Sequence, residues 1–294
     1  MVSVDSYTLT IIATASLVAA ACGYIGCFLI LRRMALLGDA ISHSVLLGIV
    51  LAFLLTGDRG IVPMFIGAAV FGLLTAVAVQ GLEHGGVQAD AAIGVTFTAF
   101  FALGVVLLTL FAGRVHLDLE HVLYGEFAYV PWDVLVIGDR SLGAKALWSM
   151  GAVALLNVAV VGLFFKEFKV CSFDPGMAAA LGINVVAFHY VLMGLVSLTT
   201  VAAFESVGAI LAVAMLIVPG ATAYLLTDNL KWMLSLSVVA GVLSACLGYA
   251  LAAWVDGSIS GAMASVSGLL FALALVFSPS HGILARIWAS RRGK

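Results

Sequence analysis

Long apolar runs, separated by short polar segments, follow one another along almost the whole chain. About nine of them approach 20 residues, the length that an α-helix needs to cross a hydrocarbon core of about 30 Å. The sixth and seventh runs lie so close together that either a short loop or a sharp bend inside the membrane can join them. The pattern predicts an all-α, polytopic membrane helix bundle of eight or nine spans, forming a single transmembrane domain over residues 1–294. The expected spans are residues 7–31, 37–56, 61–82, 91–112, 143–165, 185–203, 206–226, 230–252 and 261–278.

Composition excludes a soluble domain. Of 294 residues, 64% are hydrophobic and 10% are charged, and the mean hydropathy is +1.21, so there is too little polar surface to cover the chain in water. The net charge of -2 gives no electrostatic indication of a nucleic acid partner. The four cysteines are scattered, without the paired spacing of zinc sites or disulfide frameworks. No P-loop is found, and no segment outside the spans is long enough for a catalytic domain, so ATP hydrolysis would need another chain.

The distribution of lysine and arginine predicts the orientation, because these residues accumulate on the cytoplasmic side of a membrane. With the N-terminus outside, nine of the 13 basic residues fall on inner segments and four on outer ones, which favours a cytoplasmic C-terminus. The segment 113–142 then lies on the outer face, in the interface plane or partly re-entrant. Its His116 and His121 are expected to be solvated, or alternatively to help an ion enter.

Two ionisable residues stand out inside the second span. Asp39 and His43, in the segment GDAISH, are four residues apart and therefore share one face of a helix. A rise of about 1.5 Å per residue from the arginine pair at 32 and 33 places His43 about 15 Å into the membrane, close to its midplane. Charged groups at such a depth are costly and are by default functional, and transporters hold their substrates at the midplane.

A carboxylate with an imidazole suits a divalent transition metal such as manganese, iron or zinc. Two other interpretations remain open for Asp39 and His43: a hydrogen bond that only orders helix packing, or a proton relay. Glu205, at the boundary of the sixth and seventh spans, is a tentative third metal ligand if the chain bends inward there; otherwise it is an interfacial glutamate in a short outer turn. His189 lies near the cytoplasmic side and reads as a packing or interface histidine.

Between the fifth and sixth spans, the sequence predicts a short cytoplasmic helix over about 173–184. Asp174 can cap its N-terminus, Pro175 fits the first helical position, and Gly182 can end it. Phe173, Met177 and Leu181 recur every four residues and form an apolar ridge. The ridge either lies on the membrane surface or inserts into a groove of a cytoplasmic partner that hydrolyses ATP.

At these residues the chain resembles the metal-ion ABC-3 family of ABC importer permeases, the membrane subunits for manganese, zinc and iron(II) uptake. The resemblance covers nearly the whole chain, and its most specific blocks are LRRMALLGDAISHSVLLG at 31–48 and FKEFKVCSFDPGMAAALG at 165–182. The sequence departs from the family at Leu47, where relatives often carry proline. A proline kink in the second span is therefore not expected.

The resemblance implies a type II importer architecture in the inner or plasma membrane of a prokaryote. Two permease chains, identical or different, line one pathway, each docked on a cytoplasmic ABC ATPase subunit, and an extracytoplasmic binding protein delivers the metal. Asp39 and His43 match the family's pore-lining polar pair, and residues 173–184 match its coupling helix. No permanently bound cofactor is implied: the divalent metal is cargo, and ATP binds the partner subunit. For Glu205 the resemblance implies nothing.

The predicted function is therefore a permease subunit of an ATP-driven importer of divalent metal, with manganese favoured and iron or zinc as alternatives. Carboxylate ligands outnumber sulfur here, which favours manganese or iron, whereas the order of affinities alone would favour zinc. The alternative is a secondary transporter in which Asp39, His43 and Glu205 pass protons against a metal. An intramembrane metal hydrolase is disfavoured because the chain lacks a second paired motif such as HExxH. The chain is thus expected to be a transporter and not an enzyme.

Overall fold

The fold consists almost entirely of helices. The computed structural model describes residues 6–57, 61–111, 127, 130–137, 140–278 and 282–284. The elements are α1 (Ser6–Leu31), α2 (Ala35–Thr56), α3 (Ile61–His84), α4 (Ala89–Phe111), β1 (Val134–Ile137), β2 (Arg140–Ala144), α6 (Lys145–Leu163), α7 (Phe165–Phe173), α8 (Pro175–Ala180), α9 (Val185–Val207), α10 (Ala209–Leu226), α11 (Leu230–Val255) and α12 (Ile259–Phe277).

Nine helices within the described ranges are long and apolar enough to cross a membrane, which confirms the predicted polytopic bundle. They are α1 to α4, α6 and α9 to α12, and each matches one predicted span to within a few residues. Only Gly208 separates α9 from α10. Its φ of 80° and ψ of 167° belong to a region that glycine enters without steric cost, so a sharp turn and not a loop joins these two spans.

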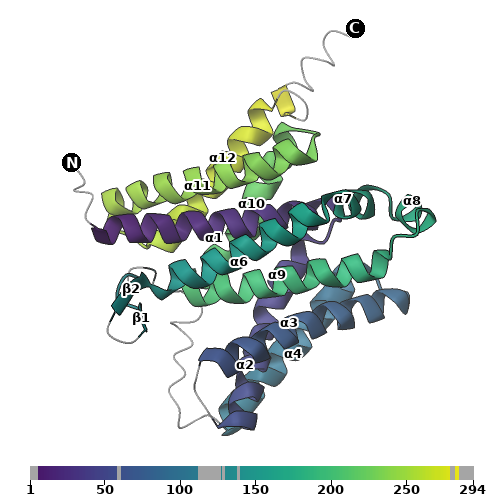
Figure 1. The fold of residues 1–294 in the computed structure, drawn as a ribbon, viewed down its shortest axis with the longest axis horizontal. Coiled ribbons are helices and arrows are strands. Elements are labelled where there is room, and N and C mark those ends of the chain that lie inside the picture. The colour runs from purple at the N-terminus through teal and green to yellow at the C-terminus, as the bar shows by residue number, and fades with distance from the viewer. Residues whose placement is uncertain are drawn as a thin grey trace.

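The helices form two groups, one around α1 and one around α2, and α9 contacts both (Figure 1). α1 packs against α10, α11, α6 and α9, while α2 packs against α3, α4 and α9. The two strands pair antiparallel and lie at the same end of the bundle as the start of α1. We call this the hairpin end. The opposite end, where α7 and α8 lie, is the α8 end (Figure 1).

Glycines allow the helices to approach closely. A Cβ atom on Gly26 would overlap the backbone of Leu216 on α10, and one on Gly48 would lie 2.8 Å from the carbonyl carbon of Gly67 on α3. Small residues serve this purpose in membranes, because helix association there depends on van der Waals contact between backbones and not on the exclusion of water. These contacts fix α1 and α2 against their neighbours.

The short helix predicted over 173–184 has the expected start and end, but it is shorter. The Asp174 side chain accepts a hydrogen bond of 2.9 Å from the Met177 amide, Pro175 occupies the first turn, and Gly182 follows the helix with a φ of 79°. α8 itself has six residues. Phe173 instead ends α7, a separate helix that the hydrophobic pattern did not predict.

The predicted outer segment 113–142 falls mostly outside the described residues, and so do His116 and His121. The part that is described contains a strand, β1, and the start of β2, neither of which was predicted. Val134 pairs with Ala144, and an irregularity follows between Val134 and Val136.

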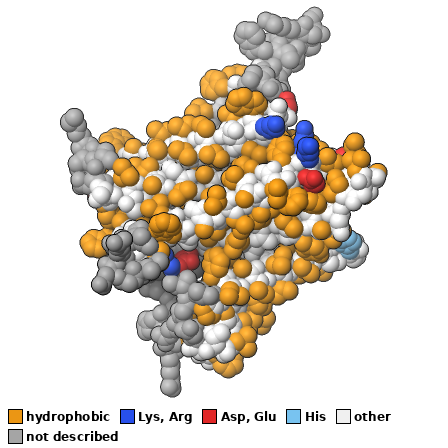
Figure 2. Space-filling view, viewed as in Figure 1, with side chains coloured by type: hydrophobic (Ala, Val, Ile, Leu, Met, Phe, Trp, Pro, Cys, Tyr) orange, Lys and Arg blue, Asp and Glu red, His pale blue; other side chains and the backbone are white. Residues whose placement is uncertain are grey.

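The visible surface reflects the membrane environment. On the face shown in Figure 2, apolar side chains cover the middle of the helices, and the charged side chains gather near the two ends. This is the distribution expected when the middle of the bundle faces hydrocarbon and its ends face water and headgroups.

The contact between Gly48 and Gly67 makes a testable prediction about stability. Gly48→Ala forces a methyl group against backbone that cannot rotate away, so we expect the protein to lose about 1–3 kcal/mol of stability, measured as a lower thermal unfolding temperature in detergent. Gly94→Ala is the control, because its new Cβ would meet no described atom within 4 Å. Equal unfolding temperatures for the two variants would contradict the close approach of α2 and α3.

Candidate functional site

Asp39 and His43 lie one turn apart on α2. The Nε2 atom of His43 is 3.5 Å from Oδ1 of Asp39. The side chains of His43 and Asp39 are 34% and 41% exposed, so neither is sealed inside the chain. The Ser42 hydroxyl, between them in sequence, donates a hydrogen bond to the Asp39 backbone carbonyl.

Packing on the other faces of α2 determines where this pair points. A Cβ on Gly38 would overlap the side chain of Leu216 on α10, and Ser44 is hydrogen-bonded at 2.6 Å by the Thr75 hydroxyl of α3. Farther along, the backbone of Leu47 lies against Gly104 of α4. These contacts hold α2 on three sides, so rotation of the helix about its axis is restricted and the face with Asp39 and His43 is fixed.

Two aromatic rings of α4 flank His43. The centroids of Phe97 and Phe101 each lie 5.6 Å from that of the imidazole, with interplanar angles of 32° and 77°. Such contacts restrict the ring to few orientations. Sequence analysis did not identify these two residues, although their spacing of four along an apolar helix was the available signal.

The pair supplies two donor atoms of the kind that divalent transition metals bind. A carboxylate oxygen and an imidazole nitrogen this close together need only small side-chain movements to contact the same ion. Within the described part of the chain, no group of three or more His, Cys, Asp or Glu side chains could hold a metal. The described residues of one chain therefore offer this site two such ligands.

Glu205 does not join this pair among the described residues. It lies near the end of α9 at the hairpin end, where its Oε1 atom is 2.7 Å from the Nζ atom of Lys145. Lys145 begins α6, and its amide donates a hydrogen bond of 2.8 Å to the Asp133 carbonyl next to β1. Sequence analysis missed this partner because 60 residues separate the two side chains. The role of Glu205 as a metal ligand stays a prediction.

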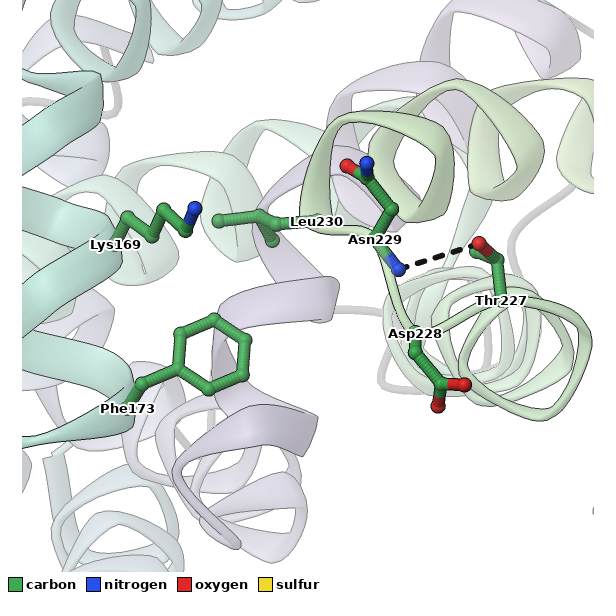
Figure 3. A pocket seen from close by; sticks show the side chains of 6 residues that line it. All are labelled: Lys169, Phe173, Thr227, Asp228, Asn229 and Leu230. Carbon is green, nitrogen blue, oxygen red and sulfur yellow. Dashed lines mark hydrogen bonds between the residues drawn. The ribbon is translucent and has the colours of Figure 1, made fainter.

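At the α8 end, the predicted apolar ridge is exposed. Phe173, Met177 and Leu181 are 55%, 55% and 62% accessible. Beside Phe173 is an open cavity of about 450 Å³ between α7 and the turn that joins α10 to α11 (Figure 3). Lys169 and Phe173 approach from α7, and the turn carries a hydrogen bond of 3.3 Å from the Asn229 amide to the Thr227 hydroxyl. The exposed apolar ridge and the open cavity beside Phe173 therefore lie next to each other at the α8 end.

Comparison with known proteins reveals close relatives. The chain is 56% identical to the manganese transport system membrane protein MntD of Bacillus subtilis, over 96% of this chain and 95% of that protein. It is 44% identical to the zinc transport system membrane protein TroD of Treponema pallidum, over 97% of this chain and 77% of that protein. Among solved structures, PsaBC from Streptococcus pneumoniae in complex with Fab is similar with a TM-score of 0.79 and 34% identity, over 98% and 96% of the two chains.

Fold and relatives define the class of protein: a multi-pass permease subunit of a bacterial ABC transporter, which is not itself an enzyme. The family profile described as the ABC 3 transport family matches residues 5–278. The chain belongs to this family, in which a separate subunit carries the ATPase.

The ion pair at the hairpin end generates a prediction of its own. Lys145→Met and Glu205→Gln should each lower thermal stability slightly, and the double variant should lose less than the sum of the two. We expect a coupling energy of about 0.2–1 kcal/mol, because both side chains are partly exposed to solvent. A double-mutant cycle of unfolding temperatures measures it. Additive losses would mean that the pair contributes nothing to stability.

Proposed function

We propose that this chain is the permease of an ATP-driven importer of divalent transition-metal ions, and that Asp39 and His43 bind the ion near the middle of the membrane. One observation carries the proposal: a partly exposed carboxylate and imidazole share one face of a membrane-spanning helix whose other sides are packed. Membership of the ABC 3 transport family supports the transporter class.

Contact with lipid would be energetically unfavourable for Asp39 and His43. A charged side chain at the centre of a bilayer costs about 2.5–3.5 kcal/mol on insertion scales, and such residues face a bundle interior or a water-filled cavity. The side chains of Asp39 and His43 contact each other but remain partly exposed at the surface of this chain. We infer that they face an aqueous route, lined on its far side by a second permease chain.

The ligand chemistry defines the cargo. Carboxylate oxygen and imidazole nitrogen suit manganese, iron(II) and zinc, and no thiolate is part of the pair. Two relatives are described as manganese and zinc transport proteins, and the manganese protein shares more of this sequence. We therefore favour manganese. If two chains face one route, their two pairs supply four donor atoms to one ion.

The α8 end is proposed to contact the ATPase. The ridge of Phe173, Met177 and Leu181 exposes apolar surface beside a short helix whose ends are fixed by Asp174 and Gly182. Such a helix can seat in a groove of a partner, as amphipathic helices do. This orientation makes the α8 end cytoplasmic, in line with the basic residues on the inner segments, and leaves the hairpin end to receive an extracytoplasmic metal-binding protein.

The proposed mechanism is alternating access. The binding protein delivers the ion at the hairpin end, the ion exchanges water for Asp39 and His43, and ATP-driven movement of α8 opens the route towards the cytoplasm. Coordination must stay incomplete, because conduction needs sites that release the ion as readily as they accept it. The position of His43 between Phe97 and Phe101 keeps its nitrogen directed towards the route without another permanent ligand.

The proposed metal ligands can be tested by substitution. Asp39→Asn and His43→Gln preserve size but remove the charge or the imidazole donor, so we expect manganese uptake to fall to the level of a transporter without ATPase activity. Uptake of ⁵⁴Mn into proteoliposomes that contain the assembled transporter measures this. Asp90→Asn is the matched control, since Asp90 is an exposed acid in the first turn of α4 and should leave uptake unchanged.

Two results would contradict this assignment. Normal uptake by both site variants would remove Asp39 and His43 from the pathway. Uptake by the purified chain alone under a proton gradient, without any ATPase, would favour the proton-coupled alternative. Assembly with the ATPase, followed by size-exclusion chromatography, should be the same for the variants and the wild type.

The coupling of ATP hydrolysis to metal uptake can be tested at the apolar ridge. Phe173→Glu and Leu181→Glu place a charge on the exposed ridge, so we expect ATP hydrolysis to continue while metal uptake is lost. The ratio of ions transported to ATP hydrolysed, measured on the same proteoliposomes, should fall at least about tenfold. Val87→Glu, an exposed apolar position in the turn between α3 and α4, is the control. An unchanged ratio in both ridge variants would exclude the docking role of α8.

A further inference from the structure

A second polar cavity, distinct from the Asp39 and His43 pair, lies at the α8 end. It has a volume of about 350 Å³ and is bordered by the turn between α1 and α2, by α3, by α7 and by the start of α9. Its inner residues include Arg32, Gln80 and His189. Arg33, Pro175 and Val186 line it as well and are exposed, so the cavity opens to the surface.

Three side chains that line this cavity have buried polar atoms without partners. Arg32 Nη2, Gln80 Oε1 and His189 Nε2 make no hydrogen bond to any described residue. Burying a polar group without a hydrogen bond is costly, and native structures contain few such groups. Arg32 Nη2, and His189 Nε2 in the tautomer that carries its proton there, are donors that an acceptor ligand would satisfy, whereas Gln80 Oε1 is an acceptor that needs a donor group of the ligand.

The charge of the cavity selects the kind of ligand. Arg32 and Arg33 are basic, and the described lining residues include no aspartate or glutamate. Burial lowers the pKa of Arg32 from its ordinary value, but a guanidinium keeps its proton in proteins. The Nε atom of Arg32 donates a hydrogen bond of 3.2 Å to the Ser172 hydroxyl, which holds the side chain while Nη2 stays free. A partly buried guanidinium with no acid among the described lining residues favours an anionic ligand.

We propose that this cavity binds a phosphate group, and that the group is the headgroup phosphate of an anionic phospholipid. Arginine donates to phosphate through several N–H groups at once, and His189 can add another donor from its ring. Phospholipid headgroups lie at the ends of membrane-spanning helices, and basic pockets between such helices bind them. The apolar Pro175 and Val186 at the opening provide surface for the glycerol and the start of an acyl chain.

The position of the site gives the ligand a structural consequence. Arg32 precedes α2, Ser172 belongs to α7, and Pro175 begins α8. A phosphate that contacts Arg32 and His189 bridges the α1–α2 turn to α9 next to this junction. The lipid therefore ties the turn that precedes the Asp39 helix to α9, which packs against the proposed docking helix α8.

Native mass spectrometry of the full-length chain in detergent tests the site without any transport assay. The probes are inorganic phosphate, dioleoylphosphatidylglycerol and the phosphate-free dioleoylglycerol. We expect one tightly retained phosphatidylglycerol per chain, and its affinity should fall about tenfold or more in Arg32→Met. Arg32→Lys keeps the cation but removes the planar fork, so it should bind with intermediate affinity even if Arg32→Met fails to fold.

The control is Lys169→Met, a basic residue of α7 that lines the other cavity of this end and should leave binding unchanged. Retention of phosphatidylglycerol but not phosphate identifies a lipid as the source, and the reverse identifies free phosphate. Equal binding of dioleoylglycerol and phosphatidylglycerol, or equal affinities of the Arg32 variants and the wild type, would overturn the proposal.

Discussion

The close packing of α2 is the constraint on which the candidate site depends. Gly38 faces Leu216 of α10, Ser44 is hydrogen-bonded by Thr75 of α3, and Gly48 meets the backbone of α3. Gly38 faces α10, whereas Ser44 and Gly48 lie one turn apart and both face α3, so two different sides of the helix are held. Since rotation of α2 by one residue would turn Asp39 towards a packed neighbour, the fold leaves its ionisable pair only one direction in which to point.

Much of this architecture could be predicted from sequence, because lipid imposes local rules. Hydropathy predicted eight or nine spans, and the described residues contain nine. The capping chemistry of Asp174 and Gly182 predicted α8, since both signals depend on neighbours in the chain. The pairing of Lys145 with Glu205 could not be predicted, because it joins α6 to the end of α9. The i,i+4 spacing of Asp39 and His43 predicted a shared face, but not the rings of α4 beside it.

The proposed ATPase contact at α8 is connected through few residues to the proposed metal ligands, Asp39 and His43. α8 follows α7 with one residue between them, and Ser172 of α7 holds Arg32 by a hydrogen bond. Arg32 lies in the turn before α2, which begins at Ala35 and carries Asp39 in its second turn. A displacement of α8 thus reaches the base of α2 through one hydrogen bond and a few residues of backbone. A phosphate at Arg32 would stiffen this connection, because it adds contacts to α9.

The number of ligands per chain suits an ion that must leave again. A site with four protein ligands on one rigid scaffold holds a divalent metal permanently, as structural zinc sites do. In the proposed site, the described residues bring two donors, Asp39 and His43 on one turn of α2, and form no group of three or more His, Cys, Asp or Glu that could hold a metal. If a second chain provides the rest, a relative movement of two helices is enough to dismantle the site. Release of the metal ion then requires only that the two chains move apart. Neither protonation of a ligand nor local unfolding is needed.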